Sequence, residues 1–207
     1  MLAARFPQSS GRAAGGVPTG VAALDEALGG GLPMGKLTEL VVAAAGGGGQ
    51  SVLAQLLQTT RASRQRVALV DAADAFVPDS LPPDALRHLV WVRCGSWEQT
   101  LAVADLLVRD ANYAVVVLDL CDVPERLLRR TPATLWHRLH RAAQGGGAVL
   151  VKTAYPIVPA VPWRLVLREP LRLADRLRSR AELVAELTVE IDRGHRAELV
   201  PYEELAG

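Results

Sequence analysis

A glycine-rich run stands between an apolar segment and a segment with helical periodicity. Its eight residues are Ala44, Ala45, Gly46, Gly47, Gly48, Gly49, Gln50 and Ser51. A run of the pattern G-x-x-x-x-G-K-[ST] binds nucleotides, because backbone N–H groups and the lysine hold the phosphates and the hydroxyl holds Mg²⁺. Here alanine replaces the first glycine and glutamine replaces the lysine. A neutral amide lacks the charge that a triphosphate requires, so the sequence predicts a vestigial nucleotide-binding loop without a catalytic residue.

Asp119 is the second residue with a place in nucleotide chemistry. It lies in an apolar run, 114–120 (AVVVLDL), that is typical of a buried strand. In nucleoside triphosphatases an aspartate at such a strand end holds the Mg²⁺ shell, whereas elsewhere it caps a loop. The sequence leaves both roles open, and it offers no Ser-His-Asp arrangement and no set of metal ligands.

A group of arginines lies between residues 125 and 141: Arg126, Arg129, Arg130, Arg138 and Arg141. Helical spacing predicts that Arg130, His137 and Arg141 share one stripe. We interpret this group as a surface for DNA phosphates or an acidic partner. The alternative is a solvated helix face in an arginine-rich protein. His137 and His140 are expected to be solvated rather than to bind a metal, since no nearby ligand completes a set.

The composition is that of an ordinary globular protein. Of the 207 residues, 50% are hydrophobic and 22% are charged, and the formal net charge is +1. The 23 basic residues include two lysines, Lys36 and Lys152, which we attribute to a GC-rich genome. No apolar run approaches the roughly 18 residues of a membrane span. We therefore expect a cytoplasmic protein in which Cys94 and Cys121 are buried, reduced thiols.

Alternating strand and helix patterns predict the architecture. Apolar runs typical of strands cover 37–43, 66–71, 89–93, 113–120 and 148–152, and helical patterns cover 21–28, 51–63, 97–109 and 134–143. This alternation predicts right-handed crossovers and a mostly parallel sheet with helices on both faces.

The pattern changes after Pro156. Strand-like segments at 164–168, 186–191 and 196–200, with a hairpin turn at 192–195, predict antiparallel strands added to the same sheet. A helical pattern at 171–183 is expected to turn Leu173 and Leu177 inward. The expected organisation is a mobile arm at 1–16, one domain at 17–202 and a tail at 203–207.

Three segments, in order and at matching spacing, resemble RecA recombinases: 17–40 (VPTGVAALDEALGGGLPMGKLTEL), 67–80 (VALVDAADAFVPDS) and 89–120 (LVWVRCGSWEQTLAVADLLVRDANYAVVVLDL). The resemblance implies a RecA-like three-layer α/β fold. The family's loop lysine falls on Gln50, and the glutamate that positions the attacking water falls on Ala73. The adenine-stacking tyrosine falls near Ser80 and the nucleotide-sensing glutamine on Thr153. Of the family's site, Ser51 and Asp119 survive, and the two DNA-binding connections are short.

This pattern of loss is similar to that of the ImuA proteins and the related SulA proteins. Similarity to ImuA implies a non-catalytic adaptor of the SOS response and translesion DNA synthesis, without ATP hydrolysis, a cofactor or membrane contact. The implied partners are an ImuB-like polymerase-related protein, RecA and an error-prone DNA polymerase complex, with weak DNA binding. Two alternatives stay open: a SulA-like cell-division inhibitor, and an ATPase in which a neighbour's arginine replaces the loop lysine.

Overall fold

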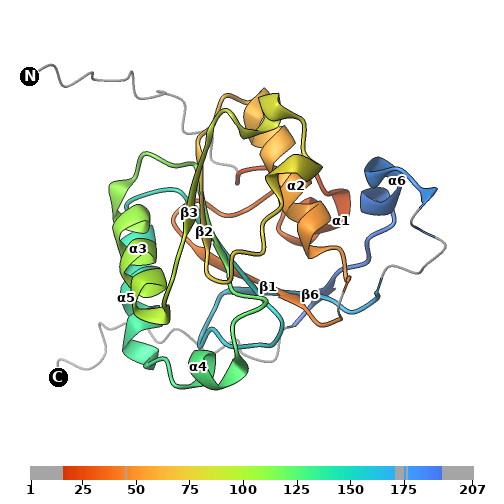
Figure 1. Ribbon diagram of the computed structural model, residues 1–207. Helices are drawn as coiled ribbons and strands as arrows, with labels where there is room; N and C mark the ends of the chain where they lie inside the picture. Colours follow the sequence, from red (N-terminus) through yellow and green to blue (C-terminus); the bar gives the residue numbers. More distant parts are fainter. Residues whose placement is uncertain (1–15, 45, 171–174, 176, 193–207) are drawn as a thin grey trace, which may run out of the picture.

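Seven strands form one sheet in the computed structural model (Figure 1), which describes residues 16–44, 46–170, 175 and 177–192. The strand order is β3-β2-β4-β5-β1-β6-β7. The strands are β1 (Leu37–Val42), β2 (Val67–Asp71), β3 (Leu89–Arg93), β4 (Val115–Asp119), β5 (Ala148–Thr153), β6 (Trp163–Leu167) and β7 (Glu190–Ile191). The helices are α1 (Ala22–Ala27), α2 (Gly49–Ala62), α3 (Trp97–Asp110), α4 (Glu125–Arg129), α5 (Ala133–Ala143) and α6 (Arg180–Ala185), with short 3-10 turns η1 (Pro78–Ser80) and η2 (Pro83–Leu86).

Strands β1 to β6 all run parallel, and β7 pairs antiparallel with β6. β5 lies between β1 and β4 in the sheet. The register places Asp71, Asp119 and Lys152 side by side on β2, β4 and β5. Because these strands are parallel, the three charged residues meet at one edge, the edge where β1 leads into the glycine-rich run.

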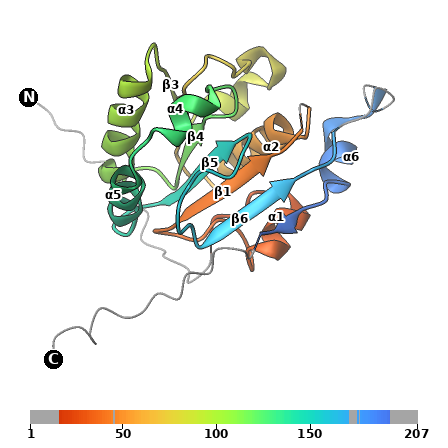
Figure 2. The same cartoon turned by 90° about the horizontal axis from the view of Figure 1, so that it is seen from below.

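The sheet separates two hydrophobic cores, because successive side chains of a strand point to opposite faces. On β4, Val115 and Val117 pack in the core that also contains residues of α1 and α2, whereas Val116 and Leu118 pack with α3, α4 and α5. Figure 2 shows the same layers, with α3 and α5 on one side of the sheet and α1 and α2 on the other. The predicted three-layer, mostly parallel α/β architecture is confirmed.

The C-terminal strands follow the prediction in part. The antiparallel addition is confirmed at β7, but β6 joins β1 in parallel. The reason is the path of 154–162, which returns to the opposite end of the sheet before β6 begins. The strand at 196–200 and most of the turn at 192–195 lie outside the described residues, as do the tail and residues 1–15 of the arm.

Two helix predictions need correction. The predicted start of the helix at 171–183 is wrong, because α6 begins at Arg180. Leu177, which was expected to point inward, is 97% exposed. Leu173 lies outside the described residues. The arginine group at 125–141 does not form one helix, because α4 ends before Pro132 and α5 starts after it. A proline disfavours the helical conformation of the residue before it, so Arg130 and Arg141 lie on separate elements.

In the ranges that the structure describes, no helix has the length and apolar content to span a membrane.

Candidate functional site

The glycine-rich run connects β1 to α2, as predicted. The Gly47 N–H donates to the Ala44 carbonyl at 2.9 Å, and the Val52 N–H donates to the Gly48 carbonyl at 2.9 Å. Gly46 and Gly48 have φ of 74° and 86°, in the left-handed region that glycine adopts without strain. The chain thus forms a tight turn that leads into a helix N-terminus, which is the backbone arrangement of a phosphate loop.

The side chains of this loop do not supply the missing charge. Gln50 is exposed and Ser51 is half-buried, both in the first turn of α2. The basic residue of α2, Arg61, lies in the last turn, at the opposite end of the helix. The glycine run and Ser51 therefore keep the predicted position, without a cation from this helix next to them.

Lys152 places a positive charge at the aspartate that a nucleotide site would use for its metal ion. The Lys152 Nζ donates to Oδ2 of Asp119 at 2.5 Å, and the two side chains are 3% and 2% exposed. The lysine stem passes the start of α2, since its Cδ is 3.5 Å from where a Cβ on Gly49 would lie. A buried charge requires a partner. Asp119 has one from the neighbouring strand, so this carboxylate is neutralised within the chain.

Cys121 lies beside this ion pair. Its N–H donates to Oδ1 of Asp119 at 3.4 Å. Burial raises the pKa of the Cys121 thiol to about 12, although the nearby Lys152 charge acts in the opposite direction. Burial also raises the pKa of Cys94. Both cysteines are half-buried free thiols, and a thiol with a raised pKa is a poor nucleophile at neutral pH.

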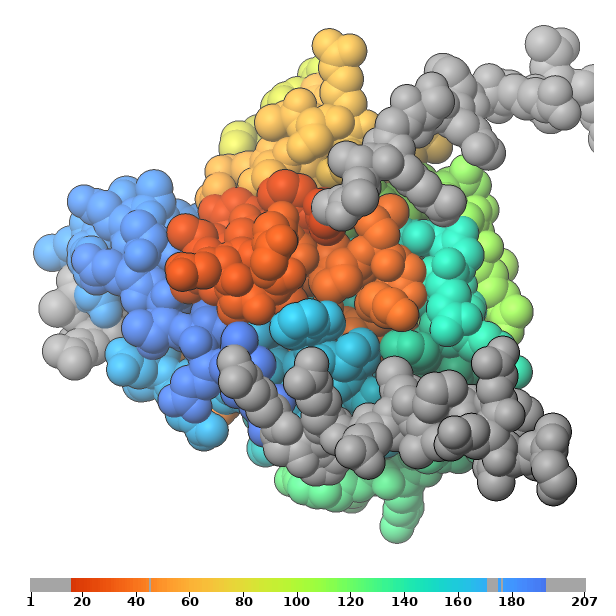
Figure 3. All heavy atoms as spheres, turned by 180° about the vertical axis from the view of Figure 1, so that it is seen from behind, coloured from red at the N-terminus to blue at the C-terminus, as the bar shows by residue number. Residues whose placement is uncertain are grey.

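The segment after β6 packs against the loop. Helix α6 starts with a capping box between Ser179 and Glu182, and Leu187 follows it. A Cβ on Gly48 would lie 2.7 Å from Cδ2 of Leu187, so an apolar side chain occupies the space next to the loop backbone. Figure 3 shows this C-terminal segment, in blue, against the surface of the N-terminal elements in red.

Ala73 and Ser80 are two further positions that correspond to nucleotide-site residues of the recombinases. In this chain their surroundings are formed by other parts of the same chain. Ala73 is exposed in the turn after β2, where Asp71 accepts hydrogen bonds from the N–H groups of Ala75 at 2.9 Å and Phe76 at 3.0 Å. Ser80 accepts at its carbonyl from Nη2 of Arg180 at 2.9 Å. Ser80, which corresponds to the adenine-stacking position of the recombinases, is therefore in contact with α6.

Thr153 belongs to a buried network that sequence reasoning missed. Its Oγ1 donates to Oε1 of Glu39 at 3.4 Å, and the Ile157 and Val158 N–H groups donate to the same oxygen at 2.7 and 3.0 Å. Nε of Arg164 donates to Oε2 of Glu39 at 2.6 Å. Glu39 thus fixes the connection between β5 and β6. The available signal was a charged residue in each of two apolar strands, because such charges must pair.

The predicted arginine surface is divided between α4 and α5. Arg129 pairs with Glu125 on α4, and Arg138 pairs with Asp105 of α3. The other members of the group, Arg126, Arg130 and Arg141, are exposed or at helix ends. Among the described residues, no group of three or more His, Cys, Asp or Glu side chains could hold a metal ion.

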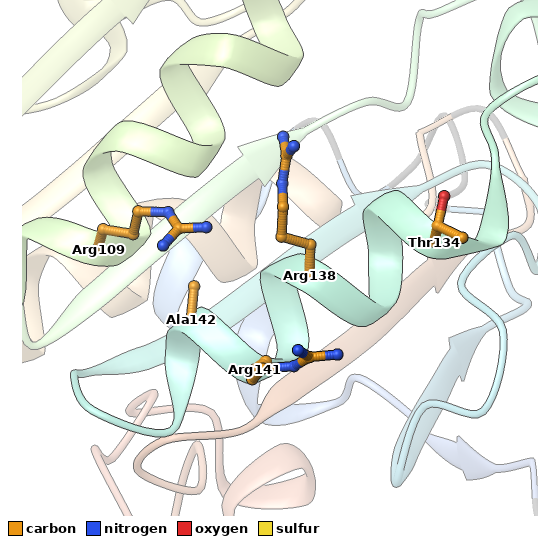
Figure 4. Close-up of a pocket in the computed structure, with 5 residues that line it drawn as sticks. All are labelled: Arg109, Thr134, Arg138, Arg141 and Ala142. Atoms are coloured by element: carbon orange, nitrogen blue, oxygen red, sulfur yellow. The ribbon is translucent and has the colours of Figure 1, made fainter.

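A hollow of about 460 Å³ lies between α3 and α5, lined by Arg109, Thr134, Arg138, Arg141 and Ala142 (Figure 4). Arg109 was missed by sequence reasoning, since it is distant in sequence from the other arginines. A second hollow, of about 440 Å³, is lined by residues of 58–64 and 82–85. Neither hollow is lined by residues of the glycine loop.

A parallel sheet with a glycine loop between its first strand and the next helix defines a phosphate-loop α/β fold. No family model matches the sequence. RecA of Nocardia farcinica is 36% identical over 107 residues, covering 50% of this chain and 30% of that RecA. RecA of Salinispora tropica is 37% identical over 107 residues, again 50% of this chain and 30% of the relative. The chain thus matches less than a third of the length of these relatives. Topology and partial identity together give it a RecA-like fold.

Proposed function

We propose that this chain is a non-catalytic RecA-like adaptor that does not hydrolyse ATP. The observation that carries the proposal is the buried ion pair of Lys152 and Asp119, 2.5 Å apart and beside the start of α2. The carboxylate that would hold a metal ion already has a cation, and the loop beside it carries Gln50 in place of a lysine.

The charges explain why both changes act against Mg-nucleotide. A divalent cation at Asp119 would lie close to the Lys152 ammonium, and a divalent and a monovalent cation 4 Å apart repel by about 8 kcal/mol at an effective dielectric constant of about 20. Phosphoryl transfer also needs a loop cation to stabilise charge in the transition state. Displacing the lysine would not restore that cation, so the two losses add.

The adaptor role follows from what the chain retains. The RecA-like fold is intact around the loop, and a recombinase fold carries surfaces for head-to-tail contacts with other subunits. By its resemblance to ImuA, the chain would join RecA, an ImuB-like polymerase-related protein and an error-prone DNA polymerase complex in translesion synthesis during the SOS response. These contacts would be made by protein surfaces rather than by nucleotide.

Calorimetry with Mg-ATP and a steady-state ATPase assay test the loss of chemistry. We expect no binding heat, no thermal stabilisation and no turnover. Steady hydrolysis that the Asp119→Ala variant abolishes would overturn the proposal, because it would show a working metal site.

The adaptor role is tested in cells and by copurification. We expect loss of the gene to lower damage-induced mutagenesis, and the purified chain to retain RecA or the polymerase-related protein. Filamentation on overexpression, with mutagenesis unchanged, would instead support the cell-division alternative.

A further inference from the structure

The hollow between α3 and α5 brings Arg109 together with two arginines of α5 that are distant from it in sequence. Thr134, Arg138 and Arg141 lie on one stripe of α5, at spacings of four and three residues. Arg109 reaches toward them from the last turn of α3 (Figure 4). A hollow with cations on both sides favours an anionic ligand.

Asp105 forms ion pairs with two of these arginines from the α3 side. Its Oδ2 accepts a hydrogen bond from Nε of Arg109 at 3.0 Å, and its Oδ1 lies 3.1 Å from Nε of Arg138. The Arg109 guanidinium therefore faces the aspartate with Nε, whereas Arg138 lies at ion-pair distance from Oδ1 without a hydrogen bond to it. The Nη donors of both arginines stay available. Arginine binds carboxylates through such paired donors, and restraining the side chain beforehand lowers the entropy cost of binding.

An apolar residue adjoins Arg109 on α3, outside the residues that line the hollow. Leu106 is 68% exposed on α3. Around the helix, at 3.6 residues per turn, Arg109 lies between Asp105 and Leu106. Among the large hydrophobic residues that the structure describes as exposed, the aromatic one is Tyr155, which follows β5. The residues that line the hollow include no aromatic ring for stacking a nucleic-acid base, whereas Leu106 beside Arg109 offers an aliphatic contact.

We propose that the α3–α5 hollow binds an acidic peptide segment of a partner protein. Carboxylates of that segment pair with Arg109, Arg138 and Arg141, and one of its apolar side chains covers Leu106. This inference rests on the proposed adaptor function, for which it supplies a docking surface. It lies on the face of the sheet opposite α2, apart from the side chains of the glycine loop.

Fluorescence anisotropy with three labelled probes tests the proposal. The first probe is an amphipathic peptide with glutamates and leucines, the second is the same peptide with serines for leucines, and the third is oligothymidylate. We expect the first probe to bind most tightly. The double variant Arg138→Glu/Arg141→Glu should weaken it by at least about tenfold, and Leu106→Ser should weaken the leucine peptide more than the serine peptide.

Arg87→Glu is the matched control, because Arg87 is an exposed arginine near η2 and its side chain is 74% accessible. It should leave binding unchanged. Arg138→Gln/Arg141→Gln, with circular dichroism, separates loss of charge from loss of folding. Three results would each overturn the inference: binding of no probe, equal binding by the double charge-reversal variant, or tighter binding of oligothymidylate with no effect of Leu106→Ser.

An ATPase assay on the same preparation keeps the two proposals apart. Peptide binding together with ATP hydrolysis would overturn the lack of catalysis and leave the docking surface standing. Absence of both peptide binding and hydrolysis would overturn the docking surface alone.

Discussion

At the scale of single residues, the site is defined by a contact that the sequence does not reveal. Lys152 and Asp119 are 33 positions apart and end two apolar runs that are easily recognised as strands. Their contact depends on β4 and β5 being neighbours, which is a property of strand order rather than of local pattern. The missing loop cation, by contrast, could be inferred from the sequence alone. The spacing of a phosphate loop fixes the position of its lysine, and Gln50 stands at that position.

Removing the lysine should expose the cost of an unpaired buried carboxylate. We expect Lys152→Met to lower the free energy of unfolding by about 3–5 kcal/mol, measured by urea denaturation. The double variant Lys152→Met/Asp119→Leu should recover most of that loss, since it buries no charge. The exposed pair of Arg168 and Glu190 provides the control: Arg168→Met should cost at most about 1 kcal/mol. A small effect of Lys152→Met would show that the ion pair does not neutralise Asp119.

The Cys121 thiol should make stability depend on pH in the alkaline range. Its pKa is raised from 9.0 to about 12 by burial in the folded chain, so the folded state holds the proton more tightly. Stability is unaffected below the unfolded pKa and falls above it, by about 1.4 kcal/mol for each pH unit while only the unfolded state is ionised. Urea denaturation at a series of alkaline pH values should show this slope. Cys121→Ala should reduce it, and an unchanged slope in that variant would exclude the thiol as its source.

At the scale of elements, the periodicity of apolar residues predicted β1 to β5 and the helices α1, α2, α3 and α5, because burial on both faces of a sheet leaves a clear pattern. After Pro156 the same reasoning located β6 and the antiparallel β7, but it was wrong about the direction of β6 and the start of α6. The direction of β6 is set by Glu39, whose contacts with Ile157, Val158 and Arg164 join three parts of the chain. The position of α6 is set by its capping box and by packing against α2. These are tertiary interactions, which periodicity within one segment does not report.

The packing of Leu187 on the loop can be measured through glycine substitutions. Gly48 and Gly29 both have left-handed φ, of 86° and 73°, but Leu187 lies next to Gly48 whereas a Cβ on Gly29 would meet nothing within 4 Å. Gly29→Ala should therefore cost only the strain of that conformation, about 1–2 kcal/mol. We expect Gly48→Ala to cost more, and Leu187→Ala to remove part of the difference. Equal costs at the two glycines would show that Leu187 does not hold the loop.

At the scale of the whole molecule, the chain has a RecA-like fold. Its own side chains make contacts at the edge of the sheet where a recombinase would bind nucleotide. Lys152 pairs with Asp119, Leu187 lies against the loop, and Arg180 contacts Ser80. The cationic hollow lies on the other face of the sheet, between α3 and α5. Under the proposed function, this separation keeps the proposed docking surface independent of the charge of the loop.

The two defects of the loop edge should be separable by restoring them one at a time. Gln50→Lys returns a cation to the loop but leaves Lys152 on Asp119, so we expect no Mg-dependent binding of ATP. Lys152→Thr frees Asp119 but leaves the loop neutral, so Mg²⁺ alone should raise the melting temperature of this variant without tightening ATP binding. The combined variant should bind Mg-ATP, because both a loop cation and a metal-binding carboxylate are then present.

Isothermal calorimetry with and without Mg²⁺, together with thermal melts, measures both effects. Hydrolysis should stay absent even in the combined variant, because Ala73 stands where the family has the residue that positions the attacking water. Gln50→Arg with Lys152→Thr is the matched control for charge without the geometry of lysine. Tight Mg-ATP binding by Gln50→Lys alone would show that Lys152 does not block the metal position, and the ion pair could then no longer support the proposed loss of nucleotide chemistry.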